Sequence, residues 1–135
     1  MAAAAEVEAE VRVLRKLRHP NIVRYVDSFM DNRKLHIVME AATGGDLKAR
    51  VDKARGVLMK EDQIVDWFIQ ITLSLKHIHD RKLLHRDLKP ANIFLDSKAR
   101  CKVGDFGLSR VMEGTFSFAQ TNVGTPYYLA PEICK

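Results

Sequence analysis

The most informative string in the chain is His85-Arg86-Asp87-Leu88-Lys89-Pro90-Ala91-Asn92. Two shorter strings follow it, Asp105-Phe106-Gly107 and then Ala130-Pro131-Glu132. Each string alone is a weak signal, because short polar motifs also occur by chance in unrelated α/β domains. All three in this order, with Asp87 and Asn92 five residues apart, favour a shared functional site over chance.

A helix and a hairpin are predicted from the pattern before this stretch. Residues 6–18 have apolar side chains at helical spacing, with acids at the start and bases at the end, which suits the helix dipole. Residues 22–30 and 35–39 are rich in branched and aromatic side chains, which is typical of strands. Asp31 and Asn32 between them are a turn signal, so the two strands are expected to pair.

The clearest predicted element is a helix over residues 62–80, which follows a short helix that begins at 47–51. Its apolar residues recur every three or four positions, and others widen this face, so the helix is expected to be largely buried. The face consists of Ile64, Phe68, Ile71, Leu75 and Ile78, widened by Val65, Ile69 and Leu73. Beyond residue 82 short apolar pieces alternate with polar loops, and residues 107–131 read as one long loop.

Composition limits the classes of protein to which the chain can belong. Of its 135 residues, 47% are hydrophobic and 29% charged, which excludes a disordered or collagen-like chain. No apolar run reaches the roughly 18 residues of a membrane span, and the start lacks the pattern of a secretory signal. We therefore expect no membrane association. We expect a cytoplasmic location, with the nucleus and the cytoskeleton as alternatives.

Charge and cysteine content add two expectations. The net charge of +5 is spread along the chain, which favours a solvated basic surface and no nucleic-acid partner. Cys101 and Cys134 fit no zinc or redox spacing, so both are expected to be free thiols.

Together the three motifs resemble the signature set of eukaryotic Ser/Thr protein kinases, with Lys89-Pro90 after Asp87 typical of that class. The strings at 92–96, 105–110 and 124–134 look most similar to the NIMA-related (NEK) kinases. The resemblance implies an α+β, protein-kinase-like fold that is incomplete. In it, residues 1–39 are an N-lobe remnant with the αC helix and one hairpin, and 40–46 are the hinge. Residues 47–135 are the C-lobe portion, with the αE helix and the catalytic loop, and end at the activation segment.

The resemblance also assigns catalytic roles. It implies that Asp87 accepts or orients the proton of a protein hydroxyl, and that Lys89 contacts the γ-phosphate of ATP. Asn92 and Asp105 would hold Mg²⁺, which prefers oxygen ligands. Thr125 resembles the threonine that supports Asp87 and Lys89. The structural residues that accompany them are Phe106, Gly107 and Glu132.

On the ATP-binding side, Met39 stands at the gatekeeper position of the family. Glu40 to Ala42 would form the hinge, whose backbone groups bond the adenine edge. Asp46 resembles the ribose-side acid, and Phe94 would lie under the adenine, with plain core packing as the alternative for Phe94.

Regulation is expected to act through residues near these motifs. Glu10 resembles the αC glutamate that pairs with a lysine in active kinases, with a surface helical glutamate as the alternative. Ser117 and Thr121 lie in the activation loop, where a phosphate from an upstream kinase would add about −1.5 to −2 charges for Arg86 to pair with. Ordinary polar loop residues are the alternative for both.

Two family features are absent from the 135 residues: a G-x-G-x-x-G loop and a V-A-I-K-type lysine. Because both contact the ATP phosphates, this chain alone is expected to be inactive or nearly so. It is also expected to be marginally stable, because the hairpin 22–39 would lose neighbouring strands and expose its edges. One alternative is a kinase remnant that binds or regulates a partner without catalysis. The other, a basic nucleic-acid-binding domain, depends on charge alone.

Overall fold

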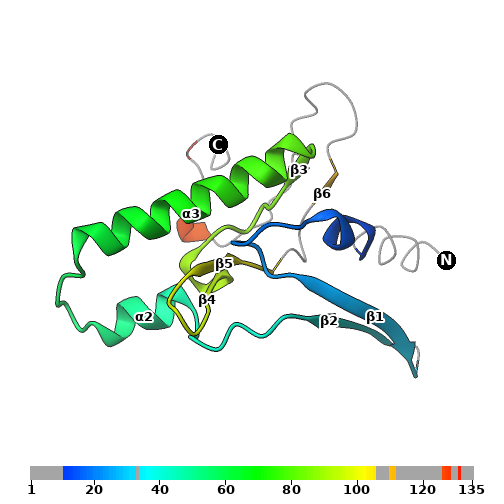
Figure 1. Cartoon of the computed structure of the whole chain (residues 1–135), viewed down its shortest axis with the longest axis horizontal. Coiled ribbons are helices and arrows are strands. Elements are labelled where there is room, and N and C mark those ends of the chain that lie inside the picture. Colours follow the sequence, from blue (N-terminus) through cyan, green and yellow to red (C-terminus); the bar gives the residue numbers. More distant parts are fainter. Residues whose placement is uncertain (1–10, 33, 106–109, 112–125, 129–130, 132–135) are drawn as a thin grey trace.

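The computed structural model describes residues 11–32, 34–105, 110–111, 126–128 and 131. Helices and strands are mixed along the chain, as the sequence predicts, and residues 11–16 are helical (Figure 1). The named elements are β1 (Tyr25–Asp31), β2 (Lys34–Met39), α2 (Leu47–Lys53), α3 (Glu61–Asp80), β3 (Leu83–Leu84), η1 (Pro90–Asn92), β4 (Ile93–Leu95), β5 (Cys101–Val103), β6 (Arg110–Val111) and η2 (Pro126–Tyr128). The strands pair antiparallel in three separate sheets, β1–β2, β3–β6 and β4–β5.

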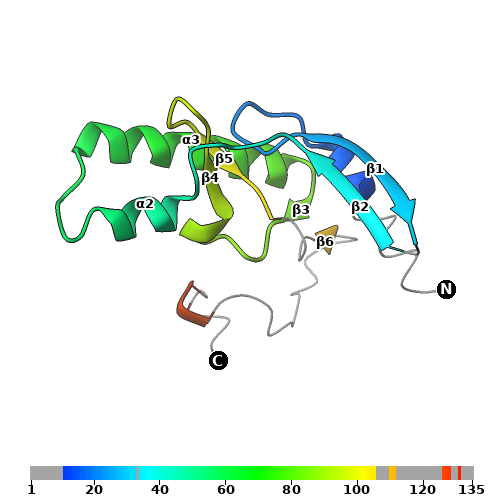
Figure 2. The same ribbon diagram turned by 90° about the horizontal axis from the view of Figure 1, so that it is seen from below.

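The predicted hairpin forms, but its first strand begins later than expected. β1 and β2 pair from Tyr25 opposite Met39 to Asp31 opposite Lys34, and Asn32 in the turn adopts a left-handed φ of 46°. Ile22 belongs instead to a bridge with Val103, where it is buried. The prediction of a strand from residue 22 is wrong because this segment pairs with β5 before the chain enters the hairpin. Figures 1 and 2 show the hairpin projecting at the end of the molecule opposite α2.

Helix α3 occupies the predicted range within one residue, and Ile71, Leu75 and Ile78 of the predicted face pack in or against the core. The rest of the buried face differs from the prediction. The buried residues are Trp67, Ser74 and Ile78, whereas Phe68 is 69% exposed. Half-exposed apolar residues accompany Phe68, namely Ile64, Val65, Ile69 and Leu73. The expectation of a largely buried helix is therefore wrong for this chain. The apolar periodicity could not include Ser74, which is buried because its hydroxyl donates hydrogen bonds to the carbonyls of Asn21 and Gln70.

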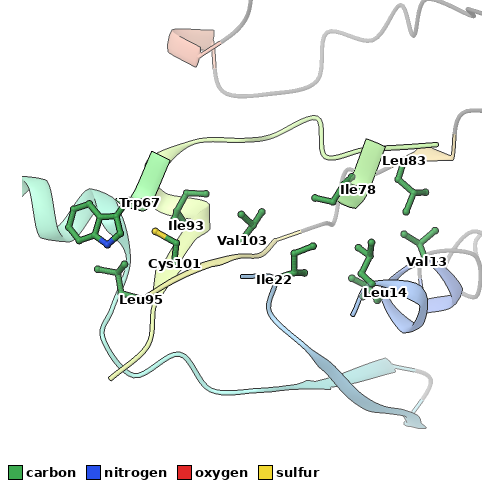
Figure 3. Packing of buried hydrophobic residues seen from close by; sticks show 11 residues of the cluster. Val13, Leu14, Ile22, Trp67, Ile78, Leu83, Ile93, Leu95, Cys101 and Val103 are labelled. Carbon is green, nitrogen blue, oxygen red and sulfur yellow. The ribbon is translucent and has the colours of Figure 1, made fainter. Parts of the chain in front are cut away.

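The hydrophobic core lies between residues 11–16, α3 and the β4–β5 pair. Figure 3 shows its side chains in one continuous row, from Trp67 and Leu95 at one end to Val13 and Leu83 at the other. Cys101 lies in this row as a free thiol, as predicted, and burial raises its pKa to about 12. Cys134 lies outside the described residues. No helix in the described part of the chain is both long and apolar enough to cross a membrane.

Asn21 connects the segment before the hairpin to the rest of the molecule. Its side-chain amide donates to Oε1 of Gln70 on α3 at 2.9 Å and to the carbonyl of Cys101 on β5 at 3.0 Å. Its own carbonyl accepts from Ser74 and from the N–H of Val103. One residue therefore satisfies polar groups of two elements that are distant in the sequence.

Candidate active site

The site is built on the loop between β3 and β4. Asn92, at the end of this loop, hydrogen-bonds back to Asp87 near its start. Asn92 is the buried last residue of η1. Its amide Nδ2 donates to the backbone carbonyl of Asp87 at 2.8 Å and to the carboxylate Oδ2 of Asp87 at 3.1 Å. The five-residue spacing that the sequence displays is therefore the length of chain that lets the asparagine hold the aspartate at both its backbone and its side chain.

Lys89 brings a positive charge to the same carboxylate. Its Nζ lies 3.1 Å from Oδ2 of Asp87, and the two side chains are 23% and 12% exposed. The ion pair is thus largely shielded from water, where charge–charge attraction is less screened than at the surface. An aspartate, a lysine and an asparagine of the motif therefore meet at one point.

His85 is a site residue that the sequence analysis did not assign. It is buried, its Nε2 lies 2.8 Å from the carbonyl of Gly104, and the N–H of Asp87 donates to its Nδ1 at 3.3 Å. Because a carbonyl only accepts and an N–H only donates, these contacts select the neutral imidazole with its hydrogen on Nε2. Burial lowers the pKa of His85, which favours the same neutral form. Its position two residues before Asp87 in the motif was the one feature of the sequence that could have identified His85 as a site residue.

Gly104 was also missed, although it places Asp105. Its N–H donates to the carbonyl of Asn92 at 3.0 Å. A Cβ at this position would lie 2.8 Å from the ring of Phe94 and 2.9 Å from Val23, so only glycine fits. Asp105 follows with an exposed side chain and a left-handed φ of 59°. Arg86 beside Asp87 has a φ of 68°, so two strained backbone positions flank the cluster.

The loop after β2 lies against β4. The N–H of Gly44 donates to the carbonyl of Leu95 at 2.7 Å, and the N–H of Leu95 donates to the carbonyl of Gly45 at 2.8 Å. Asp46 bridges to Phe94, and its carboxylate caps α2 by accepting from the N–H of Ala49 at 2.8 Å. These contacts bring the expected nucleotide residues Asp46 and Phe94 together, next to the strand that begins after Asn92.

Met39 and Glu40 lie where β2 ends. Met39 is half-exposed and pairs with Tyr25 across the hairpin. The N–H of Glu40 donates to the carbonyl of Arg24 at 2.9 Å, so this N–H is already used within the protein. The adenine-binding role of residues 40–42 stays a prediction, as do the roles of Met39, Asp46 and Phe94.

Comparisons with known proteins agree with this geometry. Residues 2–135 match the family model described as the protein kinase domain. The chain belongs to the protein kinase family. It is 54% identical over 130 residues to the Ser/Thr-protein kinase Nek1 of Mus musculus and 56% identical over 127 residues to Nek5 of Homo sapiens. It is 49% identical over 133 residues to human Nek2.

These alignments cover nearly all of this chain but a small part of each relative. They include 96%, 93% and 92% of this chain and 11%, 18% and 30% of Nek1, Nek5 and Nek2. The resemblance to Ser/Thr kinases of the NEK group is therefore confirmed over the aligned segment.

The residues present fit the magnesium ion that protein kinases use. Nδ2 of Asn92 is directed to Asp87, which leaves its amide oxygen as the atom able to bind a cation, and Asp105 is exposed. Both offer oxygen, which Mg²⁺ prefers, while ATP phosphates and water would supply the other ligands. No group of three or more His, Cys, Asp or Glu side chains suited to a metal occurs in the described residues, so an all-protein metal cage is not formed there.

Several predicted residues lie outside the described part of this kinase chain. They are Glu10, Phe106, Gly107, Ser117, Thr121, Thr125 and Glu132. Their assigned roles stay predictions. The residues that the structure brings together are Asp87, Lys89, Asn92 and Asp105, with His85 and Gly104 connecting them.

Proposed function

We propose that this chain supplies the catalytic centre of a Ser/Thr protein kinase, which transfers the γ-phosphoryl group of ATP to Ser and Thr hydroxyls of protein substrates. The observation that carries the proposal is the meeting of Asn92 and Lys89 at the carboxylate of Asp87. A purely structural loop has no need for an aspartate that is fixed at both backbone and side chain beside a partly shielded lysine.

In the proposed reaction, Asp87 orients the incoming hydroxyl and accepts its hydrogen bond. Asn92 fixes the direction of the carboxylate, and the neutral imidazole of His85 holds the N–H of Asp87. Lys89 supplies positive charge where negative charge develops during phosphoryl transfer. Bound magnesium, held by Asn92 and Asp105, would add further positive charge at the ATP phosphates.

The ATP-binding side is proposed to consist of the hinge 40–46 and its surroundings. Backbone groups of residues 40–42 would hold the adenine, with Met39 as gatekeeper, Phe94 beneath the base and Asp46 near the ribose. In this arrangement 1–39 is the N-lobe part and 47–135 the C-lobe part. The bond between Gly44 and Leu95 supports it, because it fixes the hinge next to β4.

We further propose that the 135-residue chain alone transfers phosphate poorly. It contains no Gly-rich loop and no V-A-I-K lysine, and both groups hold the ATP phosphates in kinases. Phosphorylation of Ser117 or Thr121 by an upstream kinase would add charge for Arg86 to pair with. A cytoplasmic location is part of the same proposal.

A chimeric kinase domain tests the catalytic assignment. Residues 1–135 replace the matching segment of human Nek2, to which they are 49% identical, and transfer of γ-phosphate to a Ser/Thr peptide is measured. We expect activity, with a loss of about 10²-fold or more in Asp87→Asn and Lys89→Met. Asp62→Asn, an exposed acid at the start of α3, is the control and should retain activity. An inactive but folded chimera that still binds ATP would favour the non-catalytic alternative.

A further inference from the structure

Lys102 is an unusual residue for its place in β5. Its neighbours Cys101 and Val103 are fully buried in the core, and its own side chain, on the other face of the strand, is only 13% exposed. A largely buried ammonium group is costly unless a carboxylate or hydrogen-bond acceptor compensates it. The partner of Lys102 therefore identifies what this residue does.

That partner is Glu40, the first residue after β2. Nζ of Lys102 lies 2.5 Å from Oε1 of Glu40, whose side chain is 21% exposed, and Nε of Arg24 lies 3.7 Å from Oε2. Glu40 is also held at its backbone, because its N–H donates to the carbonyl of Arg24. The start of the hinge is thus fixed both at the backbone and at the side chain of Glu40. The side-chain ion pair with Lys102 connects it to β5.

β5 leads directly to the candidate metal ligand. Lys102 precedes Asp105 by three residues. The strand is fixed to its surroundings, because the N–H of Val23 donates to the carbonyl of Val103 at 2.9 Å and the N–H of Gly104 donates to Asn92. A rigid strand therefore connects the Glu40–Lys102 ion pair to Asp105.

We propose that Lys102 is a positioning residue that sets the distance between the hinge and Asp105 through its ion pair with Glu40. This inference rests on the proposed function, since it assigns the adenine end of ATP to the hinge and the phosphate end to Asp105. A nucleotide that must reach both ends binds best when their spacing is fixed beforehand, because less ordering is needed on binding. Lys102 itself is not proposed to contact the nucleotide.

Hydrogen–deuterium exchange of the full 135-residue chain tests the positioning directly. In Lys102→Met, which keeps the apolar stem but removes the charge, we expect the backbone N–H groups of residues 40–44 to exchange about fivefold faster. Lys98→Met, at an exposed position beside β5, is the control. Glu40→Gln, which removes the other charge of the ion pair, should accelerate exchange at the same residues. Unchanged exchange at 40–44, or equal acceleration throughout the chain, would overturn the proposal.

A binding comparison separates this inference from the proposed function. Affinities of the Nek2 chimera for MgATP and for magnesium tripolyphosphate, which lacks the base and ribose, are measured by calorimetry. Loss of positioning should weaken MgATP binding in Lys102→Met about three- to tenfold and leave tripolyphosphate unchanged. Equal weakening of both would contradict a role at the hinge. If the chimera with unchanged Lys102 binds neither, the proposed nucleotide site is wrong, while the exchange experiment still decides whether the ion pair holds residues 40–44.

Discussion

Asn92 is the residue on which the geometry of the site depends most. Replacing it with Ala removes both hydrogen bonds to Asp87 and leaves a buried space. We expect Asn92→Ala to lower the free energy of unfolding by about 1–3 kcal/mol, because a largely buried carboxylate and a carbonyl lose their donor. Urea denaturation provides the measurement. Gln63→Ala, on the first turn of α3, should change stability by less than about 0.5 kcal/mol; similar losses in both variants would contradict this role of Asn92.

The close packing around Gly104 leads to a second prediction for a single residue. A methyl group there would lie closer to Phe94 and Val23 than van der Waals contact allows, so Gly104→Ala should cost about 1–3 kcal/mol by overpacking. Phe94→Leu removes ring atoms from the contact and should recover part of the loss in the double variant. A thermodynamic cycle of the two single variants and the double variant measures the coupling between them. Additive effects would show that the ring is not the obstacle.

The predictable part of the site consists of the residues that the motif carries. Asp87, Lys89 and Asn92 follow from their spacing, because a short loop brings residues two to five apart together. His85 and Gly104 were not assigned, since their roles depend on contacts with each other across 19 residues of chain. Lys102 was not assigned a role, because the sequence does not show the carboxylate of Glu40 that it meets.

At the scale of elements, α3 separates two neighbouring aromatic residues. Trp67 is 4% exposed, with its indole N–H donating to the carbonyl of Ala99 at 2.8 Å, whereas Phe68 is 69% exposed. Trp67→Ala should destabilise the chain by about 3–5 kcal/mol, and Phe68→Ala by less than about 0.5 kcal/mol. Denaturant midpoints of the two variants decide this. A large loss in Phe68→Ala would mean that the apolar stripe of α3 is covered.

Helical periodicity predicted the range of α3 and only part of its buried face. The helix has apolar residues on more than one face, so spacing alone cannot select the face that packs. Hydrogen bonds of Ser74 and Trp67 to distant carbonyls select it instead. The hairpin shows the same limit, because the pairing of Ile22 with Val103 is a long-range contact that β-propensity does not contain.

At the scale of the whole molecule, three histidines make stability depend on pH. Burial lowers the pKa of His19, His77 and His85, and the nearby Arg81 lowers the first two further. The ring centroids of His19 and His77 lie 5.1 Å apart, so the pH dependence involves both the segment before the hairpin and α3. Because the unfolded chain binds these protons more readily, stability is fully present above the ordinary pKa of 6.5 and is lost as pH falls through and below it.

Urea denaturation between pH 7.5 and 5.5 measures this dependence. We expect the urea midpoint of the unchanged chain to fall as the pH is lowered. The midpoint of His77→Asn should fall less, because asparagine does not bind a proton in this range. His36→Asn, a substitution on the hairpin remote from α3, is the control and should follow the unchanged chain. A midpoint that rises on acidification would contradict the sign derived from burial.

The connection from Asn21 to Cys101, 80 residues along the chain, has a consequence for biosynthesis. At translation rates of about 5–20 residues per second, the segment before the hairpin leaves the ribosome roughly 4–16 s before β5 exists. During that interval the partners that β5 supplies are missing, namely the carbonyl of Cys101 for Asn21 and the backbone of Val103 for Ile22. This surface of the nascent chain is therefore accessible to a chaperone until β5 is complete.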